Sequence, residues 1–519
     1  MEVVAMATAV LFEAASYALL FLATYWLLIW AYRLLLHPLS RYPGPFLAKL
    51  SDFHVGYHVL NQRLHLQTFR DHEKYGPILR HGPNKLVFSN TAALHDIYLN
   101  SSVSKSAVYD LTRQANGVSN VFNAIDKNLH RRKSRLVGRA INERSMRIFE
   151  PNMTAQIDVL LSTLLQSAGQ PLNMTTLVKR LSIDIVGLLG FGYELKTQTD
   201  ERDRWLAEGV VKGNFRINSY MNFPALRHTR MDYIMGLIAG KARLKYGELV
   251  GRLIRSRLSV ARDAHHDLYA SMTDEESLDG EKPLPQSEIF QEAVFFIPAG
   301  ADTVSAAICA VLFYITRASH RSVYDELARE IRHTFATPND VSGGPKLMAC
   351  KYLRACIDEA LRMSPPIGGT LLREQEESSK TNGEQLVVDG HIIPHGVQIG
   401  VSIYSLHHNK AYFPDPFAYN PDRWLSSSEE QKKVMKEAFV PFSIGSRSCP
   451  GKAMAYLEMS LVIAKLVSCF DISAAPGNLG LVGLRKMQAG DKGEEYDLHD
   501  VFVSTHDGPY LVFQPRKQP

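Results

Sequence analysis

FSIGSRSCPG (residues 442–451) places a single cysteine where its sulfur can bind a metal ion. Gly445 permits a tight turn that a side chain would block, and Arg447 offers a planar guanidinium that suits a carboxylate. Pro450 favours the first turn of a helix, so Cys449 should lie at a helix N-terminus. Free N–H groups and the helix dipole there stabilise a thiolate, which is the form that binds metals.

The five fixed residues of the pattern FxxGxRxCxG make this segment specific. They would meet by chance in roughly one of ten thousand chains of this length. Here the chain resembles the cytochrome P-450 family, and the resemblance covers essentially all of it. It implies that Cys449 is the axial ligand of haem b and that Phe442, Arg447 and Gly451 lie against the cofactor. A thiolate ligand pushes electron density into the iron and favours O–O cleavage.

In that family the ligand segment is matched by an ExxR helix, which here begins at Glu359. Positions three apart lie on one helical face, so Glu359 and Arg362 can pair. The pattern also fits Glu201–Arg204 and Glu326–Arg329. Chain order selects the first pair, because it alone leads into a PDRW motif that contains Arg423. The resemblance implies that Glu359, Arg362 and Arg423 form a buried charged cluster that stabilises the fold and takes no part in the chemistry.

Residues 290–316 form a long, nearly uncharged run that could pass for a membrane span. Polar residues at its centre would be costly in lipid, so we expect a core helix. The central AGADTVS resembles the family's oxygen-activation segment. Pro298 and Gly300 should open the helix locally and leave room for dioxygen and water. Thr303 would then hydrogen-bond the reacting oxygen and Asp302 would relay protons. The alternative for Thr303 is a bond back to its own helix.

Two further residues are expected to face the haem propionates. Arg373 matches the family's propionate arginine after the ExxR helix, and His130 sits where many members have Trp or His. Four residues after His130 the chain has Ser134 where the family has arginine, so Arg131 or Arg135 is the candidate replacement. The alternative is that the stretch HRRKSR is a solvated basic face, which could also meet an acidic electron-donor protein.

The N-terminus carries a segment long enough to span a membrane. Residues 14–32 are uncharged, and their aromatic side chains suit the membrane interface. No small-residue cleavage site follows, so residues 1–36 are expected to be a retained transmembrane anchor. Residues 37–50 would form a Pro-rich hinge and residues 51–519 the catalytic domain. Cationic residues follow the span, which places the domain in the cytosol behind a single pass through the endoplasmic reticulum membrane.

The rest of the chain has the composition of a globular protein. Of its 519 residues 45% are hydrophobic, and the net charge of +5 is too small and dispersed to indicate a nucleic-acid partner. Helical patterning dominates, with a strand–turn–strand at residues 78–89, a polar connection at 263–288 and a hairpin-like tail at 501–513. We therefore expect a mainly α protein with small β-sheets, the cytochrome P-450 fold. Four cysteines are expected to be small buried side chains: Cys309, Cys350, Cys356 and Cys469.

These motifs predict a haem-thiolate monooxygenase that hydroxylates or epoxidises an apolar small molecule. The chain has no Rossmann fingerprint or flavin domain, so electrons must come from a membrane-bound NADPH-dependent P-450 reductase. The similarity to filamentous-fungal members implies terpenoid, polyketide or alkaloid intermediates of secondary metabolism as substrates. The alternatives are a haem-thiolate isomerase or dehydratase that does not use O2, and a non-catalytic haem-binding sensor. The resemblance implies a pocket built from five segments, none with an evident buried charge: residues 106–122, 205–233, 295–299, 367–371 and 505–509.

Overall fold

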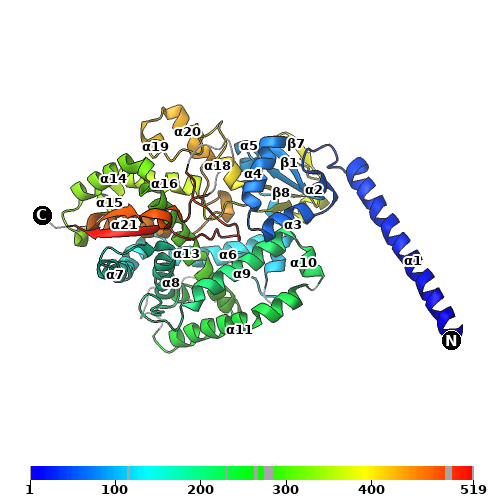
Figure 1. The fold of residues 1–519 in the computed structure, drawn as a ribbon, viewed down its shortest axis with the longest axis horizontal. Helices are drawn as coiled ribbons and strands as arrows, with labels where there is room; N and C mark the ends of the chain where they lie inside the picture. Colours follow the sequence, from blue (N-terminus) through cyan, green and yellow to red (C-terminus); the bar gives the residue numbers. More distant parts are fainter. Residues whose placement is uncertain are drawn as a thin grey trace.

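The chain folds into a mainly helical body from which one long helix projects (Figure 1). The computed structural model describes residues 2–113, 117–229, 231–261, 267–273, 284–485 and 494–516. The polar connection predicted at 263–288 lies in large part outside the described residues, and its described part contains the short helix α12 (Leu268–Thr273). The expectation of a mainly α protein with small β-sheets is confirmed.

The largest sheet has five strands in the order β1-β2-β8-β5-β3. Strands β1 and β2 form the antiparallel hairpin predicted for residues 78–89, and β2 runs parallel to β8. At the opposite edge β5 pairs antiparallel with β3, which places Lys105 directly opposite Arg373. The five strands are β1 (Ile78–Gly82), β2 (Lys85–Phe88), β3 (Val103–Lys105), β5 (Arg373–Gln375) and β8 (Gln398–Val401).

The tail of the chain belongs to a second sheet of order β4-β10-β9. The predicted hairpin within residues 501–513 is wrong, because β10 pairs with β9 and β4 and not with the residues just before it. Those residues form a loop closed by an isolated bridge between His499 and Thr505. The remaining strands are β4 (Leu172–Asn173), β9 (Phe470–Ala474), β10 (Tyr510–Pro515) and the separate pair β6 (Leu386–Val388) and β7 (His391–Ile393).

Helix α13 (Gln286–Ile315) runs through the middle of the body (Figure 1). Its apolar window is 67% buried, so the predicted core helix is confirmed and a second membrane span is not needed to explain it. It packs against α8 (Met174–Phe191), α16 (Lys351–Met363) and α21 (Lys452–Cys469). Other long helices are α6 (Lys127–Ala140), α7 (Glu143–Gln166), α9 (Trp205–Asn222), α11 (Met231–Leu258), α14 (Arg321–Thr334) and α20 (Glu429–Ala438).

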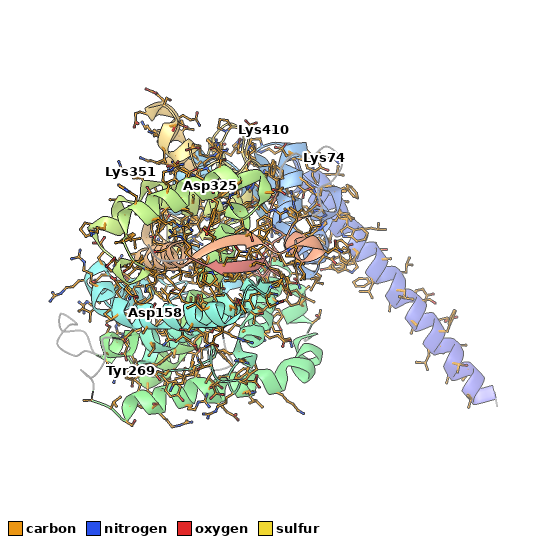
Figure 2. All side chains as sticks on the ribbon, turned by 60° about the vertical axis from the view of Figure 1, so that its left-hand side comes forward. Lys74, Asp158, Tyr269, Asp325, Lys351 and Lys410 are labelled. Carbon is orange, nitrogen blue, oxygen red and sulfur yellow. The ribbon has the colours of Figure 1, made fainter. Side chains whose placement is uncertain are left out.

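The projecting helix is α1 (Glu2–Ala31), which continues into a π-helical turn at Tyr32–Leu36. The segment Met6–Leu36 is long and apolar enough to cross a membrane, and none of its most apolar window is buried against the body. A second view shows the same helix extending away from the other elements (Figure 2). An isolated apolar helix of this length is explained by a membrane around it.

A buried arginine fastens the end of this helix to the five-stranded sheet. Arg80 of β1 donates from its guanidinium to the backbone oxygen of Arg33 at 2.7 Å. Its backbone N–H donates to the oxygen of Pro43 at 2.6 Å. Gly44 has a φ of +155°, and a side chain there would overlap the carbonyl of Arg80. The Pro-rich stretch after the helix therefore lies pinned against β1.

Candidate active site

The cysteine loop is shaped by contacts that only its own residues allow. Gly445 begins a short 3₁₀ turn (Gly445–Arg447) with a φ of +77°, and a side chain there would overlap the carbonyl of Tyr98. The backbone N–H of Cys449 donates to the oxygen of Phe442 at 2.9 Å, which closes the loop. Helix α21 starts at Lys452, with Gly451 as its N-cap. Cys449 therefore lies just outside a helix N-terminus, close to the predicted position.

The electrostatics of the Cys449 thiol are a balance of opposing effects. Burial raises its pKa, and the Gly451 N–H and the Lys452 ammonium lower it by less. The expected stabilisation of the thiolate is therefore present, but it does not outweigh burial. Protein atoms surround the thiol closely enough to raise its pKa, but the residue keeps exposed surface through which a ligand can reach the sulfur. A bound metal cation would supply the missing stabilisation, because metal coordination deprotonates a thiol.

Four basic side chains gather beside this loop and form what we call the basic cradle: Lys105, His130, Arg373 and Arg447. Lys105 and Arg373 are cross-strand partners, an arrangement that is unfavourable for like charges. Burial and then Arg373 lower the pKa of Arg447 to about 10. Burial, followed by Arg447 and Lys105, lowers the pKa of His130 to about 3, so its imidazole is neutral.

The basic cradle lacks acidic partners within its own fold. Arg447 donates to the backbone oxygen of Ile125 at 2.6 Å, and Arg373 donates to that of Leu372 at 3.0 Å. Lys105 donates to the backbone oxygen of Phe122. Within the part of the chain that the structure describes, no carboxylate forms an ion pair with Lys105, Arg373 or Arg447. Uncompensated buried cations next to a reachable sulfur fit a ligand that carries both a metal ion and carboxylates.

A second group of charges, which we call the charged core cluster, consists of Glu359, Arg362 and Arg423. Arg362 and Arg423 donate to Glu359 Oε1 at 2.8 and 2.9 Å, and the Trp424 indole donates to Oε2 at 3.0 Å. Burial alone would raise the pKa of Glu359, but Arg362 and then Arg423 bring it below its ordinary value. The structure thus brings together the three residues of the predicted cluster.

The two other ExxR pairs lie at the surface. Arg204 contacts Glu201, whose side chain is 88% exposed, and Arg329 contacts Glu326 with both side chains exposed. Only Glu359 and Arg362, the pair that chain order selected, are buried among the three ExxR pairs.

Helix α13 stays continuous through Pro298 and Gly300, so the expected local opening is not present. Pro298 cannot donate to the carbonyl of Val294. The hydroxyl of Tyr246 on α11 donates to that oxygen instead, at 2.7 Å. Gly300 serves helix packing, because a side chain there would overlap Val186 of α8. Both residues that looked like helix breakers are therefore compensated by neighbouring helices.

Comparison with known proteins identifies the fold. The Cytochrome P450 family model matches residues 41–482 of the chain. The chain belongs to the cytochrome P450 family.

Curated cytochrome P450 relatives match almost the whole length of the chain. Cytochrome P450 monooxygenase poxM of Penicillium oxalicum is 30% identical over 97% of this chain and 95% of its own length. Monooxygenase AKT7 of Alternaria alternata is 32% identical over 93% and 94%, and monooxygenase apf7 of Gibberella fujikuroi is 30% identical over 95% and 96%. This cytochrome P450 is accordingly a haem-thiolate monooxygenase.

Membership of the cytochrome P450 family identifies haem as the ligand that the basic cradle would bind. A haem carries one iron and two propionates, which matches one accessible sulfur and a group of basic side chains without acidic partners. Phe442, the first residue of the cysteine loop, has its ring centroid 5.2 Å from that of Tyr456. Cys449, Arg447, Arg373 and His130 would hold the cofactor, with Gly451 donating toward the sulfur.

Sequence reasoning missed Lys105 of this cytochrome P450. Arg131 and Arg135, the candidates to replace the arginine absent at Ser134, both lie on the exposed face of α6. Lys105 reaches the cradle from β3. The stretch HRRKSR is also not wholly a solvated face, since Lys133 is buried and bonds Glu292 at 2.9 Å.

The two predicted oxygen-activation residues are engaged within the protein. The Thr303 hydroxyl donates to the backbone oxygen of Ala299 at 2.7 Å, which is the helix bond that had been the alternative. Asp302 accepts from Asn214 of α9 at 3.0 Å and lies 3.6 Å from the Lys179 ammonium. Burial raises the pKa of Asp302, and Lys179 opposes that rise. Delivery of a proton through the Asp302 carboxyl would require these contacts to rearrange.

Side chains from segments far apart in the sequence form an apolar cluster where the substrate pocket was expected. Tyr109 and Phe122, Ile217, and Phe295 fall within segments that were expected to line it. The tail contributes Phe502, which precedes the expected segment 505–509. A buried charge that the sequence did not reveal, Asp500, lies two residues before it.

Proposed function

We propose that this chain hydroxylates or epoxidises an apolar small molecule of secondary metabolism. The observation that carries the proposal is the basic cradle beside the accessible Cys449 sulfur. When bound through a thiolate, haem supplies oxygen activation. The apolar cluster around Tyr109, Phe122 and Met221 binds and orients the substrate and excludes water. Thr303 and Asp302 hold the protons that the reaction consumes.

The reduced holoprotein tests this proposal through its carbon monoxide difference spectrum. A thiolate-ligated haem shifts the Soret band to the position typical of the family, and Cys449→His should abolish that band while haem remains bound. Incubation with a reductase, NADPH and 18O2 should place one labelled atom in the product. A reaction that proceeds in the absence of O2 would instead support an isomerase or dehydratase.

We infer that an NADPH-dependent reductase delivers the electrons next to the cysteine loop. A recess of about 410 Å³ lies there, lined among others by Phe442, Ile444, Lys436 and Lys452. Both lysines are exposed, so they complement an acidic donor surface. Lys436→Glu combined with Lys452→Glu should lower the reductase-supported rate severalfold, with a weaker dependence on salt. Lys74→Glu, far along the surface near the anchor in Figure 2, is the matched control.

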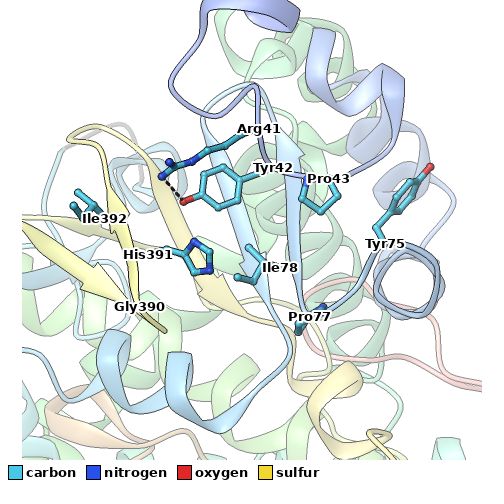
Figure 3. Close-up of a pocket in the computed structure, with 9 residues that line it drawn as sticks. All are labelled: Arg41, Tyr42, Pro43, Tyr75, Pro77, Ile78, Gly390, His391 and Ile392. Atoms are coloured by element: carbon cyan, nitrogen blue, oxygen red, sulfur yellow. Dashed lines mark hydrogen bonds between the residues drawn. The ribbon is translucent and has the colours of Figure 1, made fainter.

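We further propose that α1 holds the domain on the cytosolic side of the endoplasmic reticulum membrane. Apolar side chains that are more than half exposed surround the end of the anchor, including Phe46, Leu47, Phe53 and Tyr57. A groove of about 580 Å³ lies beside them between Arg41, Tyr42 and the hairpin residue Ile392 (Figure 3). These surfaces support contact with lipid. Protease protection of a tag at residue 2, but not of one at the C-terminus, in sealed microsomes tests the orientation.

A further inference from the structure

Three aromatic rings contact one another in a row that we call the aromatic wall, made of Phe122, Phe295 and Phe502. The Phe122 and Phe295 rings are stacked, with centroids 5.2 Å apart and planes 17° apart. Phe502 meets Phe122 edge-on, with centroids 5.1 Å apart and planes 76° apart. All three side chains are half-buried, so each keeps free ring surface. Buried Tyr109 supports Phe122 from behind at 5.3 Å.

Two observations place the aromatic wall next to Thr303 and the basic cradle. Phe295, Ala299 and Thr303 follow one another at four-residue spacing, so they share one face of α13. All three are half-buried, whereas Phe296, Ile297 and Ala301 of the same helix are buried. Lys105 of the basic cradle lies 4.9 Å from the Phe122 ring. The wall therefore extends from the cradle to the face of α13 that carries Thr303.

The position of Phe502 is imposed on it by its neighbours. Its φ of +85° is strained for a residue with a large side chain. Its backbone N–H donates to Asp500 Oδ1 at 3.2 Å, and the same oxygen accepts from Asn218 of α9 at 3.0 Å. Asp500 is itself anchored through its N–H to the oxygen of Gln62 at 2.8 Å. Surrounding structure thus holds the Phe502 ring edge-on to the wall.

We propose that the aromatic wall binds a flat, unsaturated part of the substrate, so that the enzyme prefers planar conjugated or aromatic compounds to saturated compounds of the same size. Asp500 acts as a positioning residue for Phe502. Stacked and edge-on ring pairs are more favourable than the burial of equal apolar area alone. The inference rests on the proposed monooxygenase function and narrows its substrate class from apolar molecules in general to those with a planar π-system.

Naphthalene and trans-decalin are matched probes for this preference. Each is titrated into the ferric holoenzyme, and binding is followed by the displacement of the Soret band. The ratio of the decalin Kd to the naphthalene Kd should fall roughly threefold to tenfold in Phe295→Leu and Phe502→Leu relative to the wild-type protein. Comparing ratios between proteins cancels the different solubilities of the two hydrocarbons. Phe46→Leu, a surface substitution, should leave the ratio unchanged.

Asp500→Ala should lower the ratio as much as Phe502→Leu does, and Asp500→Asn, which keeps the acceptor oxygen, should restore it. Equal ratios in wild type and both Phe→Leu variants overturn the proposal, as does the absence of any Soret displacement with either probe. If Asp500→Ala does not fold, the two Phe→Leu variants still decide. The carbon monoxide spectrum of the same samples separates these outcomes from failure of the proposed function, because that spectrum reports the thiolate-bound haem alone.

Discussion

The charged core cluster and the basic cradle both bury charged side chains, but only the cluster pairs charges of opposite sign. In the cluster, the Glu359 carboxylate meets two guanidiniums and an indole N–H, and its pKa falls despite burial. In the cradle, burial and then the cations of Arg373 and Arg447 lower the pKa of Lys105, which stands directly opposite Arg373. The first arrangement is complete within the protein, so the loss of one partner would leave a buried charge unpaired. The second is unfavourable until an anion joins it, which marks it as a binding site.

Breaking the complete cluster should have the largest effect. Glu359→Gln leaves Arg362 and Arg423 buried without a counter-charge, so we expect a loss of about 3–5 kcal/mol of unfolding free energy. Thermal unfolding and the yield of soluble protein measure it. Glu201→Gln, at an exposed ExxR pair, should change stability by less than about 0.5 kcal/mol. Equal losses in the two variants would show that the buried cluster has no special role.

Removing a cation from the cradle should weaken cofactor binding without weakening the fold. Lys105→Met removes one of two opposed cations, so the apoprotein should unfold at the same or a higher temperature. Haem affinity should fall about tenfold, as expected for one charge-assisted bond. Lys133→Met is the matched control, because it strips Glu292 of its partner and should destabilise the apoprotein. A lower apoprotein melting temperature for Lys105→Met would contradict the comparison.

Glu458 of α21 provides a third case, a buried acid that forms no ion pair with any base among the described residues. Its Oε1 accepts from Ser182 at 2.8 Å, and burial raises its pKa to about 8. The folded state keeps this proton at pH values where the unfolded chain has lost it, so stability from this group falls as pH rises toward 8. The glutamine side chain of Glu458→Gln does not titrate. The Tm of this variant minus the Tm of the wild-type protein should therefore increase by about 2–4 °C between pH 5 and pH 8. A pH-independent difference would show that Glu458 does not titrate in this way.

The smallest effect is expected at an uncharged site. Tyr246→Phe leaves the Val294 carbonyl without the donor that replaces the missing Pro298 N–H, at a cost of about 1 kcal/mol. Tyr57→Phe, at an exposed tyrosine of α3 (Phe53–Leu60), should cost nothing measurable. Thermal unfolding of both variants checks the difference.

The sequence predicted what depends on local spacing and missed what depends on distant partners. Cys449, Arg447 and the Glu359–Arg362 pair lie in short motifs whose backbone form sets their positions. Lys105 reaches the cradle only because β3 pairs with β5 from much later in the chain. Likewise, Gly300 and Pro298 suggested a broken helix, because the sequence does not show that α8 and α11 supply the compensating contacts.

The tail shows the same limit on a larger scale. The tail at 501–513 was predicted to be a hairpin, but β10 pairs with β9, which is too far away in the sequence for a hairpin turn. The residues just before β10, which were predicted to form the first strand of the hairpin, instead form the loop that contains Asp500 and Phe502. A specificity element thus arises where the local prediction fails.

Arg80 connects the apolar helix α1 to β1, one edge of the sheet, and the other edge strand, β3, carries Lys105 opposite Arg373 of β5. One hydrogen-bonded sheet therefore connects the end of the apolar helix to the residues of the basic cradle. Exchanging the anchor for another apolar helix should therefore leave the residues that would hold the haem propionates in the same relation to the end of the helix, as long as Arg80 still donates to the backbone there.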